Sequence, residues 1–427
     1  MSEKSTKTGL RDFLSTLGPG LTTGAADDDP SGISTYSVSG ATFGYSLLWM
    51  VLLTFPLMAA VQMMCARLGM ISGRGLAGNV RIHYSKWVLW GACTLLLVAN
   101  TINIGADLAG MSEATEMVTG IRSMIWTPIF TGTIISLLVW SSYRHIARVF
   151  KWLTLVLFAY VGAALISHPD WKAVAASFFV PHIEWSAEYI SVFVAIFGTT
   201  ISPYLFFWQA AQEVEEERAQ GRRTVPQRRG ATPEELRDAR NDTLVGMFFS
   251  NVIWFFITLT TATTLHRHGI THITTARQAA EALRPLAGNG AYALFTLGLI
   301  GTGMLGVPVL AGSSAYAISE AARWRGSLED KPREARHFYT VVAVSMVLGM
   351  LLDYAGFNAV SMLFWTAVVN GVLAPPLILL VLLLTNNRKV MQQHTNPPFL
   401  RWFGALTIGV MSAAAIALIV LAVNGEL

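Results

Sequence analysis

The chain has 427 residues, of which 53% are hydrophobic and 13% are charged, and its formal net charge is +4. Soluble domains carry about 25% charged residues, so this composition excludes an ordinary soluble protein and indicates a single integral membrane unit. The two cysteines, Cys65 and Cys93, fall in or beside apolar segments, which argues against a disulfide framework.

Apolar segments of membrane-spanning length recur along the whole chain. A helix that crosses the hydrocarbon core needs about 20 apolar residues. By that criterion the sequence predicts an all-α integral membrane protein with eleven transmembrane helices. They lie near residues 17–39, 45–68, 87–113, 123–141, 149–167, 189–212, 243–265, 291–319, 338–353, 357–384 and 400–423.

The distribution of lysine and arginine predicts the orientation. Cytoplasmic segments are enriched in basic residues. With the N-terminus inside, 25 of the 30 lysines and arginines fall in cytoplasmic segments and the C-terminus lies outside. The charged segment 213–242, which begins with four glutamates over 213–217 and contains seven arginines, is interpreted as a solvated cytoplasmic loop. We expect a multi-pass protein of the cell inner membrane.

The first predicted span contains three consecutive acidic residues, Asp27, Asp28 and Asp29, followed by Pro30. Hydrocarbon tolerates neither bare charge nor broken helix backbone unless both face protein or a water-filled cavity. Proline removes a backbone donor and clashes with the preceding turn, so the helix should break here. A carboxylate cluster beside a helix break predicts a cation site near the middle of the bilayer.

The sixth predicted span contains a second break, at Pro203. Five spans separate the two breaks, and an odd number of spans per repeat inverts the second copy. Interrupted helices at matching positions of two inverted halves indicate a transporter binding site. We therefore predict repeats over residues 17–167 and 189–384, followed by an extra helix over 400–423.

The chemistry of the two breaks favours a hard divalent cation. The half-helices that end near Asp28 and Thr199 present C-terminal carbonyls, which carry partial negative charge. Carbonyl and carboxylate oxygens are ligands suited to Mg²⁺, Mn²⁺ or Ca²⁺.

Several motifs resemble the NRAMP divalent-metal transporters. They are Leu17–Leu21, Asp29–Pro30, Gly40–Tyr45, Ala66–Gly69 and Ala106–Ala109. The resemblance covers most of the chain, is most specific in the first three spans, and implies a LeuT-type fold of 5+5 inverted repeats in which helices 1 and 6 are discontinuous.

Departures from the family pattern concern the residues that handle metal and protons. The family's Asp-Pro-Gly-Asn is here Asp-Pro-Ser-Gly, so Gly32 replaces an asparagine ligand. Ser202 stands at the position of the methionine ligand, Tyr204 at that of a histidine, and Gly110 at that of an acidic relay residue. This pattern resembles an NRAMP-related magnesium transporter branch.

The resemblance implies Asp29 as the main carboxylate ligand and the carbonyl of Thr199 as a second ligand. Gly32 would make space for a hydrated ion. Ser202 and Thr200 would contribute hydroxyl or water-mediated contacts, and Asp28 and Asp107 would hold waters or a salt bridge.

The leading hypothesis is a secondary transporter that imports partly hydrated Mg²⁺ and Mn²⁺ by alternating access without obligatory proton coupling. The nearest alternative is a proton-coupled Mn²⁺/Fe²⁺ importer, and another is an organic-cation transporter of the same fold. No nucleophile–base set indicates an enzyme. We expect no cofactor, no nucleic-acid partner, a lipid bilayer as surroundings and a monomeric state.

Overall fold

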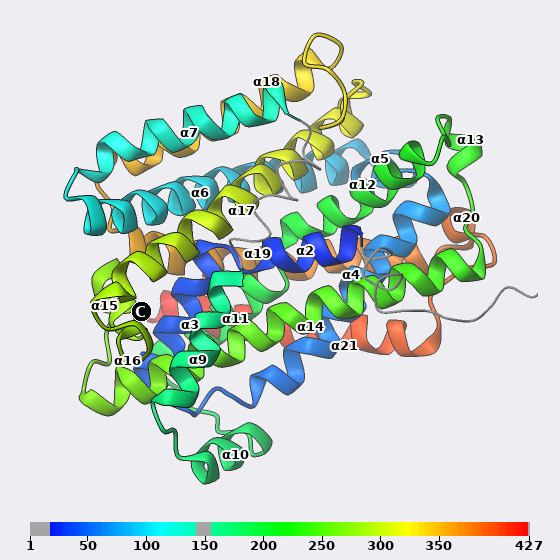
Figure 1. Ribbon diagram of the computed structural model, residues 1–427. Helices are drawn as coiled ribbons and strands as arrows, with labels where there is room; N and C mark the ends of the chain where they lie inside the picture. Colours follow the sequence, from blue (N-terminus) through cyan, green and yellow to red (C-terminus); the bar gives the residue numbers. More distant parts are fainter. Residues whose placement is uncertain (1–17, 142–154, 426–427) are drawn as a thin grey trace, which may run out of the picture.

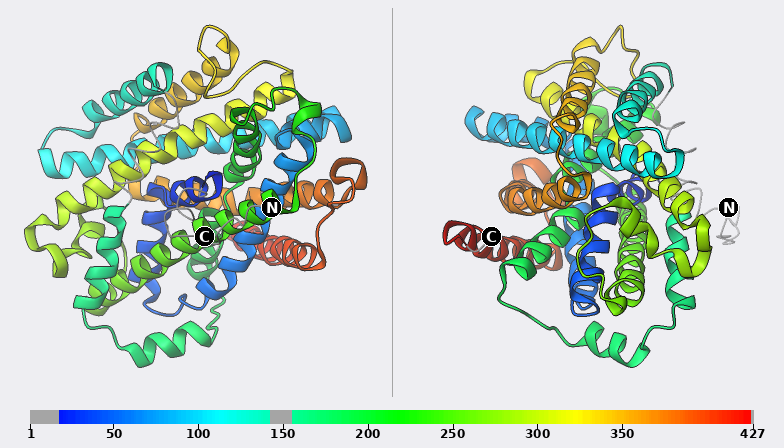
Figure 2. Two further views of the ribbon diagram at one scale, coloured as in Figure 1. Left: turned by 45° about the vertical axis from the view of Figure 1, so that its right-hand side comes forward. Right: turned by 90° about the vertical axis from the view of Figure 1, so that its left-hand side faces the viewer.

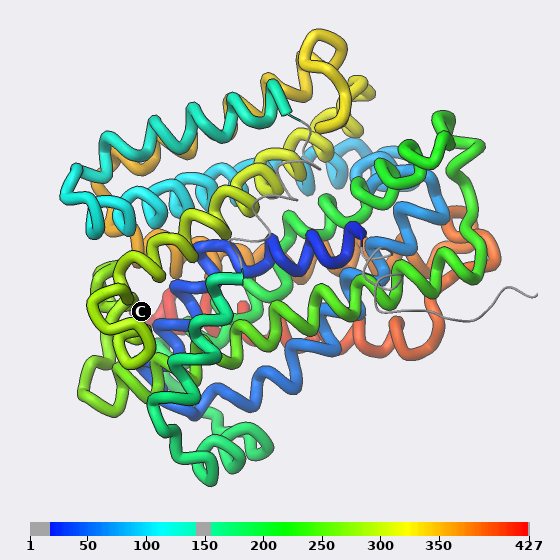
Figure 3. Tube along the Cα trace, in the orientation of Figure 1, coloured from blue at the N-terminus to red at the C-terminus, as the bar shows by residue number. Residues whose placement is uncertain are grey.

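The computed structural model describes residues 18–141 and 155–425, and all regular structure in these two ranges is helical. The long helices run side by side in one bundle (Figures 1 and 3). The first half contains α2 (Pro19–Asp27), α3 (Pro30–Phe43), α4 (Met50–Ser72), α5 (Leu76–His83), α6 (Lys86–Thr119), α7 (Ser123–Trp140), η1 (Leu155–Phe158), α9 (Ala159–Ile166) and α10 (Trp171–Phe179). The second half contains α11 (Ala187–Thr200), α12 (Pro203–Ala219), α13 (Val225–Arg228), α14 (Pro233–Thr264), η2 (His266–His268), α15 (Ala276–Glu281), α16 (Arg284–Ala287), η3 (Gly288–Gly290), α17 (Ala291–Ala322), α18 (Arg336–Asp353), α19 (Ala359–Asn386), α20 (Arg388–Met391) and α21 (Pro398–Val423).

Nine helical segments within the described ranges are long and apolar enough to cross a membrane. The first predicted span is not among them because its halves, α2 and α3, are each too short. The fifth lies partly outside the described residues, and only its apolar part over Leu155–Ile166 is seen. The all-helical membrane fold is therefore confirmed, whereas the count of eleven stays a prediction.

Large apolar side chains face outward on the peripheral helices. Trp140 on α7 is 83% exposed, and Ile416 on α21 is 61% exposed. Soluble monomers rarely expose extended apolar patches, whereas lipid tails accept them. Inside the bundle, buried apolar side chains from nearly every long helix form one continuous core.

The two repeats interlock through pairs of helices that are distant in sequence. Helix α6 packs along α17 and α18, α11 along α19, and α2 along α14. Helices α7 and α18 form an outer pair, and the C-terminal α21 covers α19 and α4 (Figure 2). These pairings leave α3, α11 and the start of α12 in the middle of the bundle.

Helix α2 is held tightly against α14. The carboxylate of Asp242 on α14 accepts hydrogen bonds from the backbone N–H groups of Gly18 (3.0 Å), Gly20 (2.6 Å) and Leu21 (3.1 Å), so an acid from another helix caps the start of α2. A Cβ at Gly20 would lie 2.6 Å from the backbone nitrogen of Thr243, closer than non-bonded atoms come. Only glycine allows the two backbones this approach.

The structure corrects the prediction that 213–242 is one solvated loop. Helix α12 continues to Ala219 and α14 begins at Pro233, so helices occupy both ends of the predicted loop. The side chains of Glu213, Glu215 and Glu217 are buried. The charge run misled the prediction because Glu213 and Glu215 are buried against polar partners, Gln209 on α12 and Ser327 after α17.

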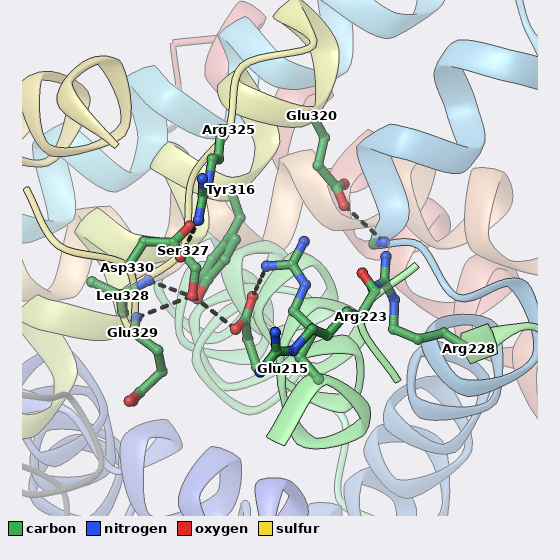
Figure 4. A network of polar contacts seen from close by, with 12 residues as sticks. Glu215, Arg223, Arg228, Tyr316, Glu320, Arg325, Ser327, Leu328, Glu329 and Asp330 are labelled. Carbon is green, nitrogen blue, oxygen red and sulfur yellow. Dashed lines mark hydrogen bonds and ion pairs between the residues drawn. The ribbon is translucent and has the colours of Figure 1, made fainter. Parts of the chain in front are cut away.

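Those partners form a polar network at one end of the bundle (Figure 4). Glu215 accepts hydrogen bonds from Arg218 and from the hydroxyl of Ser327, both at 2.7 Å. The backbone N–H of Leu328 donates to the hydroxyl of Tyr316 (3.2 Å). The network ties α12 and α17 to the segment after α17.

Candidate metal-binding site

Both predicted helix breaks are present, and each has the same local cause. Pro30 is the first residue of α3 and Pro203 the first residue of α12. Proline suits the first position of a helix, where an N–H has no intrahelical partner, but it cannot continue the helix before it. The residues before the prolines, Asp29 and Ser202, have extended backbone and serve as the N-caps. The prediction of two discontinuous helices is confirmed.

Asp29 lies at the first break with both carboxylate oxygens engaged. Its Oδ1 accepts from the backbone N–H of Gly32 (2.9 Å) and from the hydroxyl of Ser31 (2.7 Å). Its Oδ2 lies 3.3 Å from the hydroxyl of Tyr204 on α12 and 3.4 Å from the amide of Asn103 on α6. The side chain is 1% exposed. Asp29 therefore faces the bundle interior and touches three helices.

At the second break the polar groups are backbone carbonyls and hydroxyls. The Ser202 hydroxyl donates to the carbonyls of Gly198 (2.8 Å) and Thr199 (2.9 Å), and the Thr200 hydroxyl donates to that of Ile196 (2.8 Å). The Thr199 hydroxyl is buried and has no hydrogen-bond partner within the described residues. Carbonyls at the end of α11 carry the negative end of that helix dipole.

Gly32 brings the two breaks together. A Cβ at this position would lie 3.1 Å from Oγ1 of Thr199 and 3.4 Å from the carbonyl oxygen of Asp27. The absence of a side chain thus lets α3 approach the end of α11. The first turn of α3, which Asp29 caps, therefore faces the oxygens of the second break.

Asp27 and Asp28 point toward α14 instead. The hydroxyl of Ser250 donates to Oδ2 of Asp27 (2.7 Å) and lies 3.1 Å from Oδ1 of Asp28. The other oxygen of Asp27 has no partner within the described residues. The side chains of this pair thus contact α14, whereas that of Asp29 contacts α6 and α12.

Asp107 on α6 is fully buried beside the backbone of Ser31. It is close enough to Asp29 for their charges to repel. A buried carboxylate without a basic partner is costly, and a nearby cation would reduce that cost.

Four buried acids, Asp27, Asp28, Asp29 and Asp107, therefore surround the first break. No ion pair to a basic side chain is found for any of them among residues 18–141 and 155–425. In the same ranges no three acidic, histidine or cysteine side chains converge as a ready-made metal cage. An ion here would depend on Asp29, carbonyls, hydroxyls and retained water.

A narrow cavity of about 20 Å³ begins beside Pro30. Its polar lining includes Ser34, Ser37 and Glu113, and the two serine hydroxyls have no protein partner within the described residues. A cavity of this volume holds about one water molecule. Most of its other lining residues are apolar, so it is a small pocket beside the break.

Sequence reasoning missed two contributors to this centre and misjudged a third. Ser31 stands two residues after Asp29, a spacing typical of local side-chain hydrogen bonds, so the signal was present. Ser250 is one serine in an apolar helix and gave no signal. From the sequence, Tyr204 was interpreted only as the replacement of a histidine. In the structure its hydroxyl contacts Asp29 and donates to the carbonyl of Ala26 (3.0 Å).

Two interrupted helices that meet in mid-bundle around buried acids define a membrane transporter built on inverted repeats. A sequence model of the natural resistance-associated macrophage protein-like (Nramp) family matches residues 20–421, and the chain belongs to this family. The predicted family resemblance is thereby confirmed, and the family is one of transporters, not of enzymes. The magnesium-transporting branch stays a prediction.

Relatives and solved structures agree with this assignment. The divalent metal cation transporter MntH of Deinococcus radiodurans is 28% identical over 304 residues, which cover 69% of this chain and 66% of that protein. A manganese transporter structure from Eremococcus coleocola has a TM-score of 0.77 at 18% identity and covers 97% of this chain and 88% of its own. Mhp1, a nucleobase-cation-symport-1 family transporter, has a TM-score of 0.55 at 16% identity over 95% and 91% of the two chains. The structural likenesses concern the fold alone.

Proposed function

We propose that this protein transports divalent metal ions across the inner membrane, with Mg²⁺ and Mn²⁺ as its preferred substrates. The ion would bind between the two breaks and pass inward by alternating access of the two repeats. The N-terminus would lie in the cytoplasm and the C-terminus outside, and a monomer would suffice. The curated relative and the solved neighbour, named for divalent metals and for manganese, support the class of substrate.

The donor set supports a hard ion. Asp29, Thr199, Thr200 and Ser202 offer only oxygen, and Ser202 stands where the family pattern has a soft thioether. A thioether favours transition metals and contributes little to Mg²⁺, so its absence relaxes discrimination against Mg²⁺.

Partial hydration follows from the small number of protein charges at the site. The Asp29 carboxylate contacts Tyr204, which follows the second break, while Asp27 and Asp28 are turned to Ser250. Mg²⁺ loses its waters reluctantly and is usually held by one or two carboxylates with several waters retained. A site with one carboxylate and several neutral oxygens therefore suits a Mg²⁺ ion that keeps part of its water shell.

Proton coupling is not required by this chemistry. Tyr204 and Gly110 occupy the positions at which the family pattern has histidine and an acid. A divalent ion that moves inward down about 100 mV gains about 4.6 kcal/mol, at about 2.3 kcal/mol per charge. That free energy supports about a thousandfold accumulation.

The observation that carries the proposal is the position of Asp29, buried at the junction of the two breaks without a basic partner. Asp29→Asn tests it, because asparagine also caps a helix and preserves the break. Calorimetric titration with Mg²⁺ and Mn²⁺ should show affinity falling about a hundredfold or more, since a charge contact in a low dielectric is lost. The control is Asp170→Asn, an exposed N-cap of α10 that contacts the N–H groups of Lys172 and Ala173. Unchanged affinity in Asp29→Asn would overturn the proposed site.

Proteoliposomes that contain a pH dye separate the proposal from proton-coupled Mn²⁺/Fe²⁺ import. We expect Mg²⁺ uptake driven by an inside-negative potential without internal acidification. Acidification in step with metal uptake would overturn the uncoupled mechanism while leaving the metal site intact.

A further inference from the structure

A second polar cavity, distant from the metal site, lies at one end of the bundle. Its volume is about 220 Å³. It is bounded by the turn between α4 and α5, the end of α5, the residue after α13, and α20, which Figure 1 places together at that end. Contacts of α4 with α5, α13 and α20 hold these segments together.

Four basic side chains line this cavity: Arg74, His83, Arg229 and Lys389. Its lining contains no acidic residue, and within the described residues none of the four makes a side-chain ion pair. Burial and the neighbouring charges of Lys389, Arg229 and Arg74 lower the pKa of His83. The cations are therefore near enough to repel one another.

Glu320, an acid that contacts α5, is already engaged. Glu320 on α17 (Figure 4) accepts from the backbone N–H groups of Gly75 (2.8 Å) and Gly78 (2.9 Å), and the guanidinium of Arg81 donates to its backbone carbonyl. Arg81 also lies on α5 but outside the cavity lining. Glu320 thus holds α5 in place, and among the described residues it forms no ion pair with the four basic side chains that line the cavity.

The neutral polar lining is also pre-arranged. The amide of Asn79 donates to the hydroxyl of Ser72 (2.8 Å) and to the carbonyls of Arg74 (3.1 Å) and Gly75 (2.9 Å). These bonds rigidify the turn that carries Arg74. Uncompensated cations on a rigid concave surface favour an anion, and arginine matches phosphate oxygens in particular.

We propose that this cavity is a binding site for a phosphate-bearing anion, held by Arg74, Arg229 and Lys389, with His83 at its rim. Two sources share this chemistry: the headgroup of an anionic lipid and a free phosphate. Ile82, which lines the cavity, is 50% exposed, and Trp87 at the start of α6 is 89% exposed. Exposed tryptophan at a helix end is typical of headgroup depth, which puts a lipid headgroup within reach. The inference does not depend on which ion is transported.

The test uses the full-length protein in neutral detergent at low salt. One arm titrates inorganic phosphate, and the other titrates short-chain phosphatidylglycerol against phosphatidylcholine of the same chain length. The dissociation constant comes from calorimetry, and the thermal unfolding midpoint gives a second readout. The double variant Arg229→Gln/Lys389→Gln removes two exposed cations of the cavity. Lys331→Gln/Arg333→Gln removes the same charge from exposed positions after α17.

We expect the cavity variant to weaken binding about tenfold or more, because two charge-assisted contacts are lost, and the control variant to bind as the parent does. Binding of phosphatidylglycerol but not of phosphate would identify the lipid headgroup, and binding of both would identify a general phosphate site. No binding in either arm, or equal weakening in the cavity and control variants, would overturn the proposal.

Discussion

The two helix breaks share a cause but differ in chemistry. Each begins a half-helix with proline, and each lies in mid-bundle. The first carries Asp27, Asp28 and Asp29, whereas the second contributes hydroxyls and carbonyls and no charged side chain. The first break therefore supplies charged carboxylates, and the second supplies the dipoles of neutral hydroxyl and carbonyl groups. This division would let one site attract a divalent ion while keeping room for its waters.

The N-termini of α2 and α11, the helices that precede the two breaks, are also capped differently. Helix α2 is capped by Asp242 from α14, whereas α11 is capped by its own Ser186, which accepts from the N–H of Tyr189 (3.2 Å). Asp242→Ala should lower the free energy of unfolding by about 3 kcal/mol, because three N–H groups lose a charged acceptor. Ser186→Ala should lower it by about 1 kcal/mol. Denaturation in detergent measures both, and equal losses would remove the distinction.

Metal selectivity should respond to the second break. Ser202→Met introduces a soft donor, so we expect the ratio of Zn²⁺ to Mg²⁺ affinity to rise about tenfold. Ser191→Met is the matched control, because it makes the same substitution earlier on α11, where the Ser191 hydroxyl is bonded to the carbonyl of Ala187. Calorimetric competition measures the ratio. An unchanged ratio in Ser202→Met would mean that residue 202 does not face the ion.

The smallest expected effect is at Tyr204, which links the two breaks. Its hydroxyl contacts the carbonyl of Ala26 at 3.0 Å and Asp29 at 3.3 Å. Tyr204→Phe removes contacts worth about 1 kcal/mol, so Mg²⁺ affinity should change about fivefold. Phe206→Leu, on the same helix but apolar, is the control, and titration of both variants provides the comparison. A loss as large as that of Asp29→Asn would show that the hydroxyl holds the ion directly.

The site was partly predictable because some of its signals are local. Asp29, Pro30 and Gly32 are adjacent in sequence, and proline chemistry fixes the break wherever the rest of the chain lies. Asp28, expected to hold waters or a salt bridge, has its side chain beside Ser250, 222 residues away. Composition marks the 213–242 segment as exposed, yet Glu215 is buried through Ser327, 112 residues away. A run of charged residues in the sequence shows that charge is present, but it does not show which distant residues bond to those side chains in the folded protein.

The sequence by itself determined that this chain is a helical membrane protein with two helices broken at prolines and acids beside the first break. Those properties follow from hydrophobic length and from backbone chemistry within a few residues. Only the tertiary structure decided which acid contacts α12, which residue caps α2, and where uncompensated cations gather. These depend on contacts between residues that packing brings together, and no local pattern encodes them.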